Sequence, residues 1–202
     1  RCQMIGGGAT GLNPAFQHRT YLFRRKVFKL FGGAFHVFDE AGNLVFFGEQ
    51  KAFKLREDFR VYADEGKSRE LIKIKTPKIL DISATYSVTD ATNGEAVGAL
   101  KRKGLKSIIK DEWLLLSKEG KEIGKLTEKS IIGALLSRWW NLIPQTYVIT
   151  GAGEKEVAEI KQHFNPFILK YTMTMSETVP SIDPRLLLSA GILLCGIEMR
   201  QQ

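Results

Sequence analysis

Residues 183–198 read Asp-Pro-Arg-Leu-Leu-Leu-Ser-Ala-Gly-Ile-Leu-Leu-Cys-Gly-Ile-Glu, and between positions 186 and 197 the only polar side chain is Ser189. Asp183 suits a helix N-cap and Pro184 suits the first helical position, so the run predicts a helix near 184–197. As a helix, the uncharged run 186–197 is about 18 Å long, well short of the roughly 30 Å hydrocarbon core of a bilayer, and a membrane span is not favoured. Because it is apolar on every side, we expect the rest of the protein to surround it.

The preceding residues supply that surrounding structure as a series of β-hairpins. Five units consist of an apolar strand, a turn that contains glycine, and a second strand; they occupy residues 37–47, 60–75, 88–98, 114–124 and 148–158. Hairpin turns often need a residue with positive φ, which glycine adopts without strain. We therefore expect positive φ at Gly42, Gly66, Gly94, Gly120 and Gly153.

Two further strands, at 21–30 and 167–175, raise the total to about twelve, and an antiparallel sheet of that size curls or closes. The predicted fold is mainly β: a closed antiparallel barrel of about twelve strands around the buried hydrophobic C-terminal helix. The strand side chains alone cannot fill so wide a barrel, and the helix supplies the missing core. Gly191 and Gly196 would let inner side chains approach its backbone. We expect residues 1–15 to form a flexible leader and 16–202 a single domain.

Residues 130–144 depart from the strand pattern. Helical spacing is shown by Ile131, Leu135, Arg138 and Leu142, which precede a proline, and this predicts a short amphipathic helix at the barrel rim. Two functions are open for the adjacent Trp139 and Trp140. We favour a cover over the open end of the barrel, and the alternative is contact with a membrane interface.

Composition limits the compartment and the partners. The 202 residues carry a formal net charge of +8, which favours anionic membrane, nucleic acid or acidic protein as a partner. Cys2 and Cys195 lie at opposite ends of the chain, so no disulfide framework is predicted. The first residues show no apolar signal-peptide core. We expect a cytoplasmic protein, with peripheral membrane association as an option.

The sequence shows no recognisable catalytic or metal-binding motif. His18, His36 and His163 are far apart and lack neighbouring ligands, so we expect no metal and no cofactor. The glycine-rich residues 5–11 have no strand before them or helix after them, unlike a phosphate-binding loop. Seven of the 22 carboxylates fall in or beside the hairpin turns, where they serve turn geometry: Asp39, Glu40, Asp64, Glu65, Asp90, Glu119 and Glu154. We do not expect an enzyme, although an active site built from turns at the barrel rim stays open.

Basic residues give the stronger functional indication, in two clusters. The candidate lipid-binding residues are Lys101, Arg102, Lys103, Lys106 and Lys110 in one cluster, and Arg24, Arg25 and Lys26 in the other. Near an anionic bilayer each such charge contributes about 1 kcal/mol. The alternative is that both clusters are simply solvated strand faces that discourage edge aggregation. Nucleic acid is less favoured, because interleaved aromatic residues and a recognition helix are missing.

Several segments, in this order and spacing, resemble the tubby-like superfamily, and most closely its phospholipid scramblase and LURP-one-related branch. They are residues 21–26, 51–55, 99–107, 111–113 and the terminal Asp183-Pro184-Arg185 with its apolar run. The resemblance covers about residues 16–198. It implies a twelve-stranded barrel around a hydrophobic helix, and association with phosphoinositide or other anionic lipid. Residues 163–170 contain no carboxylate where scramblases carry an acidic calcium-binding segment, so no calcium site is carried over.

The charge and the resemblance together favour a non-enzymatic barrel module that binds anionic phospholipid, phosphoinositide or phosphatidylserine, through its basic strand faces. Two alternatives stay open. One is a phospholipid scramblase, and the other is a regulatory protein that binds a protein or nucleic-acid partner.

Overall fold

The structure is a computed structural model that describes residues 11–26, 33–53, 56–76, 85–103, 112–129, 144–163, 165, 167–177 and 180–197. Its elements, in chain order, are η1 (Pro14–Gln17), β1 (Thr20–Lys26), β2 (Gly33–Phe38), β3 (Leu44–Phe53), β4 (Arg56–Tyr62), β5 (Glu70–Lys75), β6 (Thr85–Asp90), β7 (Ala96–Arg102), β8 (Glu112–Leu116), β9 (Glu122–Glu128), β10 (Thr146–Thr150), η2 (Ala152–Glu154), β11 (Glu156–His163), β12 (Ile168–Met175) and α2 (Pro184–Ile197). The predicted helix at 130–144, with Trp139 and Trp140, falls almost wholly outside the described residues.

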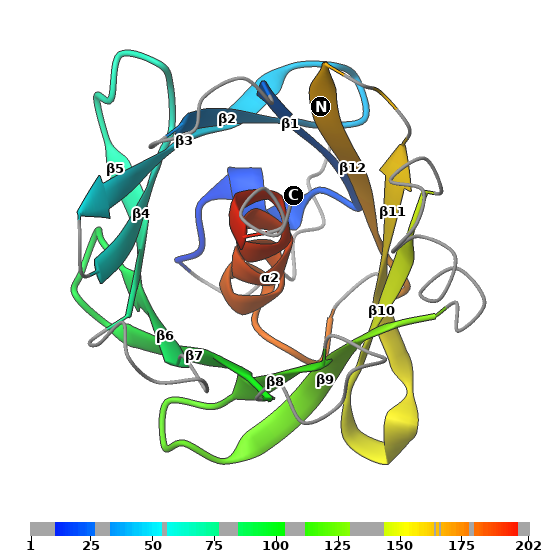
Figure 1. The fold of residues 1–202 in the computed structure, drawn as a ribbon. Helices are drawn as coiled ribbons and strands as arrows, with labels where there is room; N and C mark the ends of the chain where they lie inside the picture. Colours follow the sequence, from blue (N-terminus) through cyan, green and yellow to red (C-terminus); the bar gives the residue numbers. More distant parts are fainter. Residues whose placement is uncertain are drawn as a thin grey trace, which may run out of the picture.

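The strands form one closed barrel in the order β1-β12-β11-β10-β9-β8-β7-β6-β5-β4-β3-β2, and α2 runs through its centre (Figure 1). Neighbouring strands are antiparallel throughout. Alternation sets which side chains face the helix: on β12, Tyr171, Met173 and Met175 are buried, while Thr172 and Thr174 are only partly buried. The predicted barrel and its central helix are confirmed.

The five predicted hairpin turns lie together at one end of the barrel, which we call the turn end. They join β2 to β3, β4 to β5, β6 to β7, β8 to β9 and β10 to β11. Gly42, Gly94, Gly120 and Gly153 have positive φ, as expected. The expectation for Gly66 is wrong. In that turn the next residue, Lys67, takes the left-handed conformation at φ 57°, and its amide donates to the Asp64 carbonyl oxygen.

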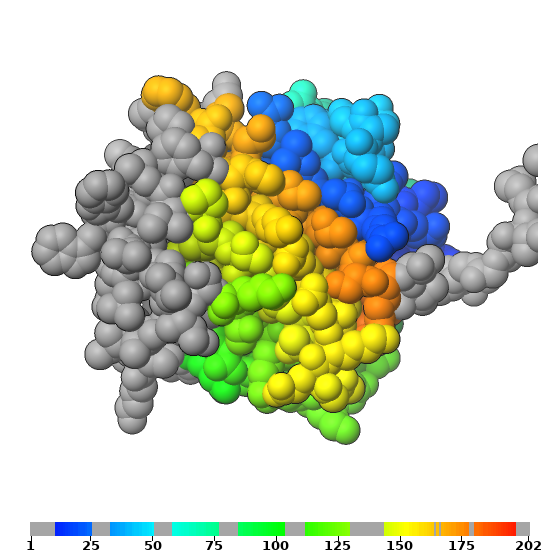
Figure 2. Space-filling model, turned by 90° about the vertical axis from the view of Figure 1, so that its right-hand side faces the viewer, coloured from blue at the N-terminus to red at the C-terminus, as the bar shows by residue number. Residues whose placement is uncertain are grey.

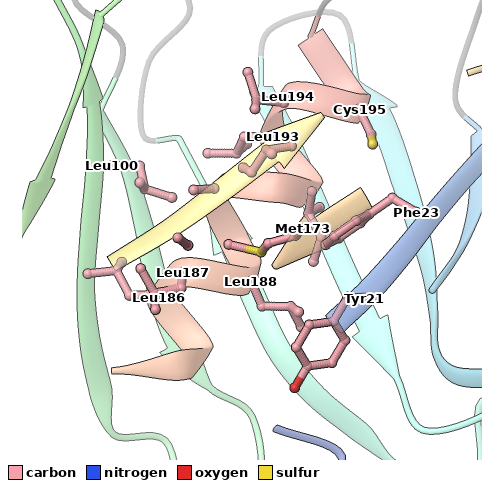
Figure 3. Close-up of a cluster of buried hydrophobic side chains, with 14 of the residues drawn as sticks. Tyr21, Phe23, Leu100, Met173, Leu186, Leu187, Leu188, Leu193, Leu194 and Cys195 are labelled. Atoms are coloured by element: carbon pink, nitrogen blue, oxygen red, sulfur yellow. The ribbon is translucent and has the colours of Figure 1, made fainter. Parts of the chain in front are cut away.

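Local capping starts α2 where the sequence predicts. The Asp183 backbone oxygen accepts hydrogen bonds from the amides of Leu186 and Leu187, and its side chain accepts one from the Arg185 amide. The next turns bury leucines against the barrel wall on every side (Figure 3). At 14 residues α2 is too short to cross a bilayer, and no other helix in the described ranges is long and apolar enough to do so.

Two helix glycines admit aromatic rings of the barrel wall, as predicted. A Cβ on Gly191 would lie 2.7 Å from the Phe23 ring, and one on Gly196 would lie 2.4 Å from the Phe59 ring. Real Cβ atoms do not come so close to other heavy atoms. Glycine at these two positions therefore lets both rings reach the helix backbone.

The polypeptide before β1 also contacts the core. Phe16 is buried, with its ring centroid 5.0 Å from that of Phe46. Leu12 and Ala15, which belong to the predicted flexible leader, pack against the same core. The Tyr21 hydroxyl donates a hydrogen bond to the Ala15 backbone oxygen. Residues 1–10 lie outside the described part of the chain.

Candidate functional site

Strand alternation divides the first predicted basic cluster between the two faces of the barrel wall. Arg24 is exposed on the outer face. Arg25 points inward and only 5% of its surface is exposed, although it also lines the pocket next to Arg24. Consecutive residues in a strand necessarily face opposite sides, and an unbroken run of charge therefore cannot form one surface. The side chain of Lys26 is outside the described part.

The second cluster is divided in the same way. Lys101 is partly buried on the outer face, opposite Thr85. Arg102 lies on the inner side, 5.9 Å from the centroid of the buried Trp113 ring. Lys103 is exposed, but its ammonium forms a 2.8 Å ion pair with Glu112, which raises the pKa of Lys103. Lys106 and Lys110 are not among the described residues.

The structure instead brings together basic side chains from four neighbouring strands. His36 on β2 is opposite Arg24 on β1, Arg24 is opposite Lys170 on β12, and Lys170 is opposite His163 on β11. We call these four side chains the basic row. Figure 2 shows β1, β12 and β11 side by side on one face of the molecule, in blue, orange and yellow. Like charges directly opposite one another destabilise a sheet, so Arg24 and Lys170 are an unfavourable pair without an anion.

The two histidines at the ends of the basic row have fixed neighbours. The Nε2 atom of His36 is 2.5 Å from a Glu65 carboxylate oxygen, and its ring packs near those of Phe38 and Phe47. The Nε2 atom of His163 is 2.6 Å from the Thr172 hydroxyl. These contacts hold both imidazole rings against the outer wall.

Within the described ranges, the central cations of the basic row have no carboxylate partner. Neither Arg24 nor Lys170 forms an ion pair with any residue that the structure describes, and the Arg24 guanidinium lies 5.7 Å from the Phe38 ring centroid. Arg60 on β4 differs, because it bonds Asp58 at 2.6 Å and Glu70 at 2.8 Å and its charge is balanced locally. At Arg24 and Lys170 no carboxylate of the described residues provides such a balance.

A pocket of about 450 Å³ opens beside Arg24 and His36. Its volume lies within the range of roughly 300 to 1,000 Å³ that is usual for small-molecule sites. Gly33, Ile168 and Glu65 also line it. Arginine binds phosphate through a planar fork of donors, so the guanidinium of Arg24 at this pocket suits a phosphorylated headgroup.

Metal chemistry finds no support in the described ranges. They contain no group of three or more His, Cys, Asp or Glu side chains arranged to hold a metal ion. The one cysteine that the structure describes, Cys195, is buried within α2, and burial raises the pKa of its thiol. A buried protonated thiol is a poor nucleophile and a poor metal ligand.

Comparison with known families agrees with this architecture. The model of the LURP-one-related family matches residues 19–195, which include all twelve strands and most of α2. The chain belongs to the LURP-one-related family. This family is part of the tubby-like superfamily, and its members are generally non-enzymatic. Searches of curated proteins and of solved structures gave no match.

Sequence reasoning missed three members of the basic row in this LURP-one-related protein. His36, Lys170 and His163 lie far apart in the chain, and each looks like an isolated polar position. The signal that could have found them is strand register, since the alternation at Tyr171, Met173 and Met175 already places Lys170 on the outer face. The pairing of β12 with β1 then aligns Lys170 with Arg24.

Proposed function

We propose that this LURP-one-related protein is a non-enzymatic module that binds anionic phospholipid peripherally, through the basic row on its outer wall. The observation that supports it is the cross-strand pair of Arg24 and Lys170, which has no ion-pair partner among the described residues. Such a pair costs stability in the isolated protein, and an anion placed between the two cations offsets that cost. The basic row thus provides a site for negative charge.

A membrane surface fits this site better than an isolated small anion. Each lysine or arginine close to an anionic leaflet contributes about 1 kcal/mol and acts within a Debye length of about 8 to 10 Å. With the chain's net charge of +8, several such contributions add up to measurable affinity. The pocket beside Arg24 offers room for one phosphorylated headgroup. Phosphoinositide and phosphatidylserine are the candidate lipids, and a location at the cytoplasmic face of a membrane follows from them.

The remaining candidate contacts from the sequence are secondary. Lys101 faces outward and could extend the charged surface over β7. Lys26, Lys106 and Lys110 stay predictions, as do Trp139 and Trp140. Arg102 and Lys103 contribute less, because one lies against Trp113 inside the wall and the other is paired with Glu112.

Flotation with vesicles tests the proposal. We expect the protein to float with phosphatidylserine or phosphoinositide vesicles at low salt, to float less at high salt, and to ignore pure phosphatidylcholine. The double variant Arg24→Glu, Lys170→Glu should stay at the bottom of the gradient. A matched control, Lys118→Glu, Lys121→Glu, makes the same charge change on exposed residues of the β8–β9 turn and should float like the wild type.

Two results would overturn the proposal. One is failure to bind anionic vesicles even at low salt, which would leave a protein or nucleic-acid partner as the better hypothesis. The other is equal loss of binding in the control variant, which would show a general charge effect without a site. Leaflet exchange in proteoliposomes separates a scramblase from a peripheral binder, since a peripheral binder moves no lipid with or without calcium.

A further inference from the structure

One aromatic side chain stands out from the otherwise buried apolar residues. Phe167, in the turn between β11 and β12, is 61% exposed. Across the described ranges it is the one large hydrophobic side chain that lies exposed, whereas Phe23, Phe35 and Phe59 are fully buried. Scattered exposed apolar residues are normal on proteins, so exposure alone decides nothing. Phe167 is of interest because hydrogen bonds hold its turn in place and because it lies close to the basic row.

Local hydrogen bonds hold the turn that carries Phe167. The side-chain oxygen of Asn165 accepts from the amide of Phe167 at 2.9 Å and from the amide of Ile168 at 3.0 Å. Asparagine side chains that bond the backbone two residues on are a standard way to fix a turn. Because the backbone is already ordered, little conformational entropy is lost when the ring enters another environment.

Phe167 lies close to the basic row. It precedes Lys170 by three residues, which corresponds to about 10 Å along a strand. The same turn follows His163, the last residue of β11 and the outer member of the basic row. In Figure 2 the gold atoms of this turn project from the upper left edge of the molecule, on the face that also shows β1, β11 and β12. An aromatic ring and the cations Arg24 and Lys170 therefore lie near the same edge of the barrel wall.

We infer that Phe167 inserts into the interfacial region of the bilayer while Arg24 and Lys170 contact lipid phosphates. This inference rests on the proposed function and adds the orientation of the protein, with the β11–β12 turn directed at the membrane. Aromatic side chains favour the boundary between headgroups and acyl chains, and peripheral proteins combine such residues with basic ones. A protein partner fits less well, since a stable interface usually buries about 800 Å² on each side and one ring provides far less.

A fluorescent probe at position 167 tests the insertion directly. The variant Phe167→Cys is made in a Cys2→Ser background and labelled with the environment-sensitive fluorophore NBD. Cys195 is only 1% exposed, so it should not take the label. On addition of phosphatidylserine vesicles we expect a blue shift in emission and quenching by lipids brominated near the headgroup. The control label at Lys118→Cys, in the β8–β9 turn, should show neither change.

A second variant keeps the inference falsifiable without a label. Phe167→Ala should weaken vesicle binding about ten- to one-hundred-fold, the value of burying one phenylalanine side chain, and Phe167→Leu should retain most of the affinity. The salt dependence should stay unchanged, because the basic row is intact. If the wild type floats but the 167 probe is not quenched, or if Phe167→Ala binds normally, the insertion is wrong and the proposed function stands. If the wild type does not float, both fail.

Discussion

The Arg25 guanidinium donates a hydrogen bond to the Cys195 backbone oxygen at 3.2 Å, and so joins the first strand to the last turn of the central helix across 170 positions. Its other terminal nitrogen donates to the Gln50 side chain at 2.8 Å. The last carbonyl groups of a helix have no partner within the helix, and a cation is favourable at that end. This buried arginine therefore caps α2 from the barrel wall and fixes how deep the helix sits.

Removal of the Arg25 cap should destabilise the barrel. Arg25→Leu leaves the Cys195 carbonyl and the Gln50 amide without this donor, and we expect a loss of about 1 to 3 kcal/mol in the free energy of unfolding. Arg25→Lys keeps the charge but not the fork of donors. Its free energy of unfolding should therefore lie between those of the wild type and of Arg25→Leu. Urea denaturation followed by circular dichroism gives the values. Wild-type stability in Arg25→Leu would show that the cap is dispensable.

The helix glycines should not tolerate a methyl group. In Gly196→Ala the new Cβ would lie 2.4 Å from the Phe59 ring, and overpacking of this kind costs about 1 to 3 kcal/mol. The better helix propensity of alanine, worth about 1 kcal/mol, offsets only part of that cost. Adding Phe59→Leu should restore stability by making space. If the stability losses of Gly196→Ala and Phe59→Leu simply add in the double variant, the proposed contact between these residues is contradicted.

A charge inside α2 should abolish the fold. Leu193 is 1% exposed, and Leu193→Asp would bury a carboxylate with no partner, which proteins rarely survive. We expect insoluble protein or loss of the cooperative thermal transition. The control Lys121→Asp changes an exposed turn residue and should keep the wild-type melting temperature to within a few degrees. A folded Leu193→Asp protein that merely loses membrane affinity would show that α2 is a membrane anchor.

Stability and lipid binding should move in opposite directions when Lys170 is reversed. Lys170→Glu places a carboxylate opposite Arg24 and His163, so we expect a gain of about 0.2 to 1 kcal/mol in the free energy of unfolding. Vesicle binding should fall, because the row has lost a cation and gained an anion. Thermal melts and flotation of the same preparation check both effects. A destabilised variant would mean that Lys170 has a structural role.

Acid should weaken the ion pair between Asp90 and Arg185, which lies in the first turn of α2. Burial acts to raise the pKa of Asp90, but hydrogen bonds from Thr92 and Arg185 outweigh it and hold that pKa below its ordinary value of 3.8. A carboxyl with a lowered folded-state pKa contributes stability above its unfolded pKa, and loses it as the pH falls through the folded value. Urea midpoints between pH 7 and pH 2 should therefore drop more steeply for the wild type than for Asp90→Asn. If the urea midpoints of the wild type and of Asp90→Asn fall in parallel with pH, Asp90 makes no such contribution to stability.

The sequence by itself determined the architecture, because the signals for it are local. Alternating apolar residues, glycines in the turns and the Asp183-Pro184 start of an uncharged helix each act within a few residues. They predict the strands, the hairpins and a helix that needs a surrounding barrel. The error at Gly66 is of the same local kind, since the neighbouring Lys67 can also take a left-handed conformation.

Only the tertiary structure decided which charges meet. Arg24 and Arg25 are adjacent in the chain, yet one faces solvent and the other caps α2, because a strand turns successive side chains to opposite faces. Lys170 lies far along the chain from Arg24 and becomes its direct neighbour when β12 closes the barrel against β1. Closure and register are long-range properties of the whole sheet, and the basic row exists only once they are set.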